Sequence, residues 1–393
     1  MTCNDSAGRW REDAARGQLK LVDALRILVF KTDPALFDRL DFEDDESLLD
    51  PLLFAYFTDP APAQPLAQLL YARIPPERRP ASIEVHSDTS GSVFLPGLGE
   101  LCTGGGARGL ELRGEPNLAC WADGRVVAGA WRAAEKIPGT AIEITSGAHP
   151  LLARFLVADD GAAVEVGEVC RQYIPHVHRA CALLRDDCPA VWNDIAAVTR
   201  RIVLFRGDLP NSFATLSAHG AIFCNVTTAI DEVFFLEDIA HQAGHVLFNA
   251  LTVEKEALFT VDPSTTIDSF GAEASHARTL YAAVHGLFTY TTIGEVLSAC
   301  CDCVTGRKAH ELLGRLGMIL QKFESDIALL DRPALYTPSG LLWWQYFDGV
   351  FRRLHACHAA RVGFFDYSNQ PYVFSYELFA ERNPLLVMEA AAR

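Results

Sequence analysis

The strongest constraint on the fold is the spacing of apolar residues between positions 231 and 251. Apolar side chains recur there at three- and four-residue intervals, at positions 236, 239, 240, 243, 246, 247, 250 and 251. This spacing places them on one buried face of an α-helix. A neighbouring stripe of the same helix carries Glu237, His241, His245 and Asn249. The sequence therefore predicts a half-buried helix with two histidines one turn apart on one face.

The pattern of the remaining chain predicts an α+β protein. Helical spacing over the first 75 residues is interrupted by the proline-rich stretch IPPERRP. Short alternating segments follow to about residue 157, which is typical of strands. From about residue 164 helical spacing dominates, apart from the short apolar pieces RIVLFRG and GAIFCNV. We expect a mixed helix and strand region over 1–160 and a mainly helical region over 161–393, with a small sheet beside the histidine helix.

Composition narrows the possible partners. The net charge of −16 opposes binding to nucleic acid, and no block of Lys and Arg offsets it. No apolar run approaches the ~20 residues of a membrane span, and we expect no signal peptide in the polar N-terminus. The 11 cysteines lack framework spacing, so we expect reduced thiols and a cytoplasmic protein. The oligomeric state does not follow from the sequence.

The two histidines have the spacing of paired metal ligands. A catalytic site usually adds a third protein ligand and keeps open positions. The best third candidate is His285, in the helical segment ARTLYAAVHGLFTYTT. Polar residues share a face of that segment and need a polar cavity; they include Arg278, Tyr281, Thr289 and Thr292. We predict a metal site at His241, His245 and His285, and ligand type alone leaves zinc, iron and other first-row ions open.

Gln242 stands where the HExxH signature of zinc peptidases has its glutamate. In those enzymes the glutamate takes a proton from the metal-bound water, which an amide cannot do. General-base help contributes roughly 10²–10⁴-fold in rate. The site is therefore poorly equipped for hydrolysis but intact for redox chemistry, in which Gln242 could orient a ligand or co-substrate.

Residues 200–300 resemble the HExxH-type peptide-modification proteins. The resemblance lies in a short strand at 220–223, the acids after it, the HxxxH helix and the segment RTLYAAVHG. It implies an Fe(II)- and 2-oxoglutarate-dependent oxygenase that uses O₂ to hydroxylate the β-carbon of a residue in a ribosomally made precursor peptide. By this resemblance His241, His245 and His285 are the iron ligands. Gln242 departs from the family's glutamate, and the first 160 residues carry none of the resemblance.

A 2-oxoglutarate site needs a cation for the far carboxylate. Arg278 lies two turns before His285, about 10 Å along the helix, and a guanidinium can bind a carboxylate through two hydrogen bonds. We expect Arg278, Tyr281 and Thr289 to bind the co-substrate. The alternative is that Arg278 pairs with Glu273 or another acid. The N-terminal region is a candidate for recognising the peptide, as an added strand at a sheet edge.

Two other functions remain open. A zinc hydrolase would need Glu237 or Glu273 as the base in place of Gln242. A catalytically inactive relative would retain peptide binding alone.

A rival iron site is possible in the strand-rich segment. HSD at 86–88, with His149 and Arg154 downstream, has the order used by jelly-roll 2-oxoglutarate oxygenases. The segment is short for eight strands with their loops. A surface turn at Asp88 is the simpler interpretation.

Overall fold

The fold is described from a computed structural model of the 393-residue chain. The structure describes residues 9–114, 118–145, 147, 149–157, 164–226, 230–270 and 278–385. The chain forms two compact units that alternate along the sequence. The helical unit comprises residues 1–14, 175–198 and 228–393, and the mixed unit comprises residues 15–174 and 199–227.

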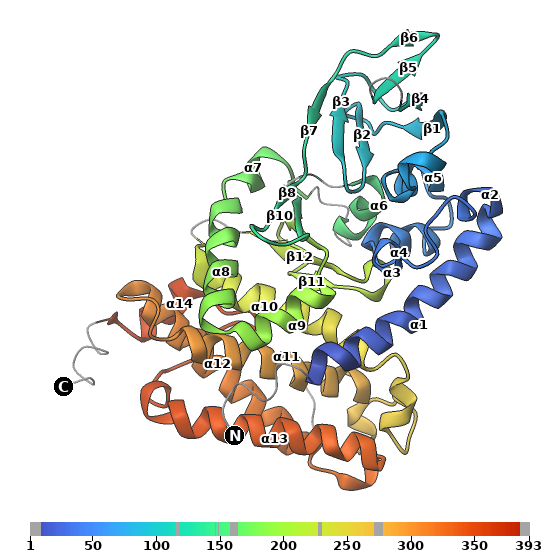
Figure 1. The fold of residues 1–393 in the computed structure, drawn as a ribbon. Coiled ribbons are helices and arrows are strands. Elements are labelled where there is room, and N and C mark those ends of the chain that lie inside the picture. Colours follow the sequence, from blue (N-terminus) through green and yellow to red (C-terminus); the bar gives the residue numbers. More distant parts are fainter. Residues whose placement is uncertain are drawn as a thin grey trace. The chain divides into compact units, whose positions relative to one another are not determined.

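The mixed unit holds three small sheets (Figure 1). One is antiparallel, with the order β1 (Ser82–His86), β4 (Gly109–Arg113), β5 (Ala119–Ala122) and β6 (Arg125–Val126). Another is antiparallel, with the order β2 (Ser92–Leu95), β3 (Gly99–Cys102) and β7 (Ala130–Arg132). The third has the order β11 (Phe213–Ala214), β12 (Ala221–Asn225), β10 (Arg201–Phe205), β9 (Glu143–Thr145) and β8 (Glu135–Lys136).

The third sheet forms the core of the mixed unit. Its central strands β12, β10 and β9 are parallel, and every residue of β10 and β12 is buried. Continuous apolar runs are typical of parallel strands covered on both faces. Apolar side chains of α1, α4 and α6 pack with Val203, Phe205 and Phe223 in one cluster.

Short helices complete the mixed unit. The mixed unit contains α1 (Arg9–Thr32) from residue 15 onward. The short helices are α2 (Pro34–Phe37), α3 (Asp45–Leu48), α4 (Pro51–Phe57), α5 (Leu66–Leu70), η1 (Tyr71–Arg73), η2 (Pro76–Arg78), α6 (Pro150–Ala153), η3 (Arg154–Leu156), α7 (Glu168–Arg171) and η4 (Leu216–Ala218). α4 shows why such short segments are helical. Pro51 occupies its first turn, and the Asp50 carboxylate accepts a hydrogen bond from the Leu52 amide.

The helical unit is built around four long helices that pack in succession (Figure 1). These are α10 (Glu232–Leu251), α11 (Leu280–Cys300), α12 (Arg307–Leu330) and α13 (Pro338–Val362). The shorter elements are α8 (Ile174–Asp187), α9 (Pro189–Val198), η5 (Lys255–Leu258), η6 (Ile267–Phe270), η7 (Pro333–Leu335) and α14 (Tyr376–Arg382). Trp10 belongs to this unit because its ring stacks on Trp343 of α13, with centroids 4.5 Å apart.

Side-chain caps set the starts of the long helices. Asp231 accepts a hydrogen bond from the Val233 amide at the start of α10. Thr279 and Thr337 do the same for the amides of Ala282 and Gly340 at the starts of α11 and α13. Each oxygen satisfies a backbone N–H that has no partner within its own helix.

The α+β class and the helical C-terminal region are confirmed. The helix expected over 231–251 is α10, with Asp231 as its cap. RIVLFRG and GAIFCNV do form strands, but these are β10 and β12 of the mixed unit. Their sheet also contains β9 and β8 from the N-terminal segment, because β10 pairs with β9. The units also interleave, whereas the sequence suggested one boundary near residue 160.

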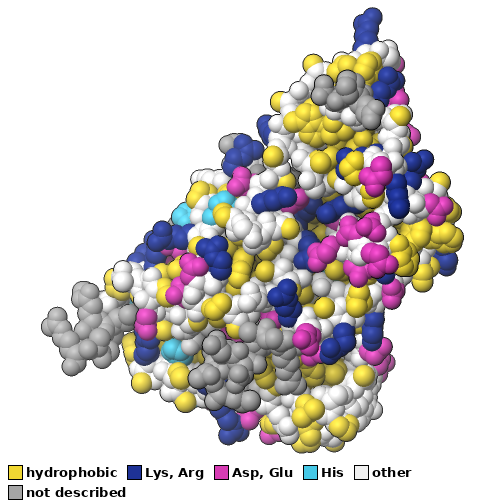
Figure 2. Space-filling view, viewed as in Figure 1, with side chains coloured by type: hydrophobic (Ala, Val, Ile, Leu, Met, Phe, Trp, Pro, Cys, Tyr) yellow, Lys and Arg dark blue, Asp and Glu magenta, His cyan; other side chains and the backbone are white. Residues whose placement is uncertain are grey.

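Among the described residues, no helix combines the length and the apolar character needed to cross a bilayer. On the face drawn in Figure 2, acidic side chains have basic side chains close by.

Candidate metal centre

The site begins with the close approach of α10 and α11. A Cβ at Gly244 would lie 2.7 Å from Oγ1 of Thr292. That hydroxyl donates a hydrogen bond to the Ala240 carbonyl oxygen at 3.0 Å. A side chain at position 244 would clash with this hydroxyl, so the glycine lets Thr292 pack against α10 one residue before His245.

His245 lies between the other two histidines. Its ring centroid is 4.9 Å from that of His241 and 4.6 Å from that of His285. Its Nδ1 lies 3.0 Å from Nε2 of His285. Two nitrogens bound at right angles to one ion at about 2.1 Å are about 3.0 Å apart. The separation therefore suits neighbouring metal ligands as well as a hydrogen bond.

The structure thus brings the three predicted ligands into one cluster. Across the described parts of the chain, no group of three or more His, Cys, Asp or Glu side chains already surrounds a single point in the manner of a metal site. A shared ion would need rotation of at least one ring between staggered positions. His241 and His245 line a pocket, and His285 is not among its lining residues.

All three imidazoles are neutral at pH 7. Burial, with help from the nearby charge of Lys322, lowers the pKa of His241 to about 4. Burial, and then His241, lowers the pKa of His245 to about 3. The pKa of His285 also lies well below its usual value, first because of burial. Neutral imidazole is the form that binds metal ions.

A pocket with a cavity volume of about 170 Å³ opens beside His241 and His245. α10, α11 and α12 form its walls, together with the segment 372–374 that precedes α14. Its lining combines apolar groups, such as Met318 and Ile319, with charged ones, namely Glu237, Arg278, Arg315 and Lys322.

The two arginines of the pocket are engaged in ion pairs. Arg278 forms a bidentate pair with Asp326, with N–O distances of 2.9 and 2.8 Å. Arg315 donates to Glu237 at 2.7 Å and twice to Glu311, at 3.0 and 2.7 Å. The alternative in which Arg278 pairs with an acid is the arrangement present, although the acid is Asp326. Glu273 lies outside the described residues.

The other predicted site residues are divided between the pocket and the surrounding helices. Thr289 lines the pocket, and its hydroxyl donates to the Gly286 carbonyl oxygen. Tyr281 is not among the lining residues, and its hydroxyl pairs with Thr252 Oγ1 at 2.7 Å. Gln242 is 2% exposed and also absent from the lining. Its Nε2 donates to Asp238 at 3.2 Å, so its role here is to join two turns of α10.

Sequence reasoning missed Arg315 and Lys322. They lie on α12, which carries no recognisable motif. The available signal was their place on one helix face with Met318 and Ile319, at three- and four-residue steps. Only the packing of α12 against α11 turns that face toward the histidines.

The rival HSD site is a turn. The Asp88 carboxylate accepts hydrogen bonds from the amides of Ser90 and Ser92 and from the Ser90 hydroxyl. His86 Nδ1 pairs with the Ala63 carbonyl oxygen at 2.7 Å. His149 caps α6 by accepting from the Leu151 amide. These groups are used within the local structure, which supports the simpler interpretation of this segment.

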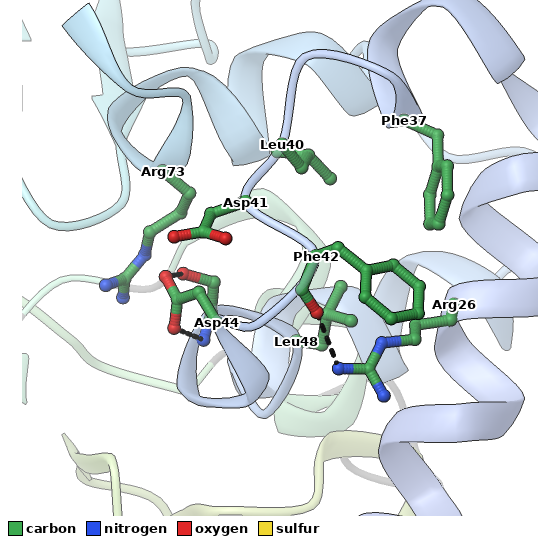
Figure 3. Close-up of a pocket in the computed structure, with 9 residues that line it drawn as sticks. Arg26, Phe37, Leu40, Asp41, Phe42, Asp44, Leu48 and Arg73 are labelled. Atoms are coloured by element: carbon green, nitrogen blue, oxygen red, sulfur yellow. Dashed lines mark hydrogen bonds between the residues drawn. The ribbon is translucent and has the colours of Figure 1, made fainter.

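A smaller hollow, with a cavity volume of about 20 Å³, lies in the mixed unit (Figure 3). Arg26 donates to the Phe42 carbonyl oxygen at 2.9 Å and pairs with Asp45. Its guanidinium also lies 4.8 Å from the centre of the Phe42 ring. Asp44 caps α3 through the Ser47 amide. These polar groups satisfy one another, and the hollow carries no chemistry of its own.

In comparisons with known proteins, no family model matches the chain and no curated protein sequence matches it. Evidence for the function therefore comes from the geometry and charge of the three histidines and the pocket beside them.

Proposed function

We propose that this chain is an Fe(II)- and 2-oxoglutarate-dependent oxygenase that hydroxylates a carbon of a peptide. The observation that carries the proposal is the clustering of three imidazoles from two helices, of which His241 and His245 line a charged pocket. An all-imidazole set suits iron and other first-row ions. The resemblance of residues 200–300 to peptide-modification proteins favours iron among them.

The residues present fit such a centre. His241, His245 and His285 would hold the ion, and their neutral state means that few protons compete for the nitrogens at pH 7. With the 2-oxo acid and O₂, bound iron supplies the oxidising power needed to hydroxylate an unactivated carbon.

The surrounding side chains hold and shield the reacting groups. Met318, Ile319 and Ile293 give the pocket an apolar wall, which limits access of water. Phe248 packs against the His285 ring, with centroids 4.9 Å apart, and so restricts its orientation. The pocket's cations attract an anionic co-substrate.

Hydrolysis is less well supported. The position of the HExxH glutamate is held by Gln242, which is buried and bonded to Asp238. Glu237 does line the pocket, but its carboxylate already accepts a hydrogen bond from Arg315 at 2.7 Å.

We also propose that the substrate is a ribosomally made precursor peptide and that the protein works in the cytoplasm. The resemblance supports the peptide. The ten cysteines of the described residues form no disulfide, as is usual in proteins of reducing compartments.

Anaerobic reconstitution tests the proposal. Fe(II) and 2-oxoglutarate should give the charge-transfer absorption of the chelate, and admission of air should release succinate. His285→Ala should abolish both signals. His355→Ala is the matched control, because His355 lies on the exposed face of α13. Absence of both signals in the wild type, or their persistence in His285→Ala, would refute it.

A further inference from the structure

Lys322 differs from the other basic residues of the pocket. Among the described lining residues it is the one cation with no acidic oxygen within the 4.0 Å of an ion pair. Its Nζ donates to the Tyr372 carbonyl oxygen at 2.7 Å and lies 4.5 Å from the centre of the Tyr372 ring. An ammonium has three N–H donors, so Lys322 can keep this bond and still bind a ligand.

The two arginines are poor candidates for the same task. The guanidinium of Arg278 directs two N–H groups at Asp326, and that of Arg315 directs three at Glu237 and Glu311. Both guanidinium charges are already balanced by these acids, so a ligand carboxylate gains most at the cation that has no acidic partner.

The charge balance of the pocket favours a dianionic ligand. The positive charges are those of Arg278, Arg315 and Lys322. They are matched by the carboxylates of Glu237, Glu311 and Asp326. Imidazole binds metal ions in its neutral form, so a divalent ion held by histidines adds two uncompensated positive charges. A small dianion restores the balance, with one end at the ion and the other at a cation.

Position also fits Lys322 for this role. It stands two turns after Arg315 on the pocket face of α12, about 10 Å along the helix. It lines the same pocket as His241 and His245. The long, flexible stem lets the ammonium move toward a ligand, whereas the paired arginines are held in place.

We propose that Lys322, and not Arg278, binds the far carboxylate of a small dianionic oxo acid and thereby selects dicarboxylates over monocarboxylates in this pocket. The inference rests on the proposed function for the ligand class. Lys322 acts by binding, and the segment 372–374 that its Nζ holds forms the adjoining wall of the same subsite.

Calorimetric titration with a matched ligand pair tests the assignment. 2-Oxoglutarate and 2-oxopentanoate have the same chain length and differ only in the terminal carboxylate. We expect the wild type to bind 2-oxoglutarate more tightly, and Lys322→Met to lose about tenfold or more of that preference. Lys322→Arg should retain part of it. The double variant Arg278→Met/Asp326→Leu removes both members of the neighbouring pair and should retain the preference.

Two arms separate this inference from the oxygenase proposal. Titrations with EDTA measure the metal-free protein, and anaerobic titrations with Fe(II) measure the loaded one, with iron uptake by Lys322→Met determined alongside. A preference that depends on Lys322 in the EDTA arm supports the subsite even if no succinate is ever formed. A wild type without preference in both arms, or Lys322→Met with the wild-type preference, overturns the inference.

Discussion

Gly244→Ala probes the contact that brings the histidine helices together. The new Cβ would lie 2.7 Å from Oγ1 of Thr292, well inside van der Waals contact. Overpacking of this kind costs about 1–3 kcal/mol, while exchange of helical glycine for alanine normally gains about 1 kcal/mol. We expect a net loss of about 0–2 kcal/mol in the free energy of unfolding, and weaker metal binding by about tenfold because the supports of the ligand rings shift.

Gly286→Ala provides the matched control on the partner helix. Its Cβ would approach only Nη1 of Arg278, at 3.9 Å, so the helix-propensity gain of up to about 1 kcal/mol should be realised. Gly244→Ala/Thr292→Ala removes the clashing hydroxyl and should recover most of the loss. The assays are urea unfolding and metal titration. If Gly244→Ala is as stable as Gly286→Ala and binds metal normally, the close contact has no role in forming the site.

Three further predictions concern the charges around the pocket. Arg315→Met leaves the buried Glu311 and the half-buried Glu237 without their ion-pair partner, and it should lower the free energy of unfolding by about 3–5 kcal/mol. Arg352→Met, at a side chain 75% exposed, should change it by less than about 0.5 kcal/mol. Equal losses in urea unfolding would contradict the first estimate. The pKa values of His241 and His245, about 4 and about 3, lie below the value of an unfolded chain. The unfolded chain therefore binds more protons, and the free energy of unfolding should fall as the pH drops from about 6.5 toward 4. His241→Gln should flatten this pH dependence in unfolding measurements, and an unchanged slope would count against burial of the neutral ring. Gln242→Glu places a second carboxylate beside Asp238, away from the pocket lining, and should destabilise the fold by about 1–3 kcal/mol. The zinc-loaded variant should not cleave peptides. Peptide cleavage by this variant would favour the hydrolase over the oxygenase.

The parts of the fold that depend on local pattern could be predicted from the sequence. The apolar spacing of α10 and the carboxylate of Asp231 suffice to locate that helix and its start. His285 could be linked to the same site because both helices carry polar stripes on otherwise apolar faces. The meeting of His245 with His285 follows from two such stripes facing one another across a close helix contact.

Long-range pairing could not be predicted in the same way. Arg278 meets Asp326, which lies 48 residues later on another helix, and nothing near Arg278 indicates that acid. β10 and β12 were recognisable as buried strands, but β9, the other parallel neighbour of β10, lies some 60 residues earlier than β10. Parallel pairing leaves no local turn signal in the sequence. Lys322 could not be singled out from the sequence, because it differs from Arg278 and Arg315 only in lacking an ion pair with an acid.

X-ray absorption at the iron edge of the Fe(II)-loaded protein tests whether His241, His245 and His285 bind one iron. We expect scattering from three imidazoles at about 2.1 Å, the usual distance for a bound ring nitrogen. It also predicts loss of one imidazole shell or of bound iron in His285→Ala, with the His355→Ala spectrum matching the wild type. Iron bound without imidazole scattering, or a spectrum unchanged by His285→Ala, would contradict a centre formed by His241, His245 and His285.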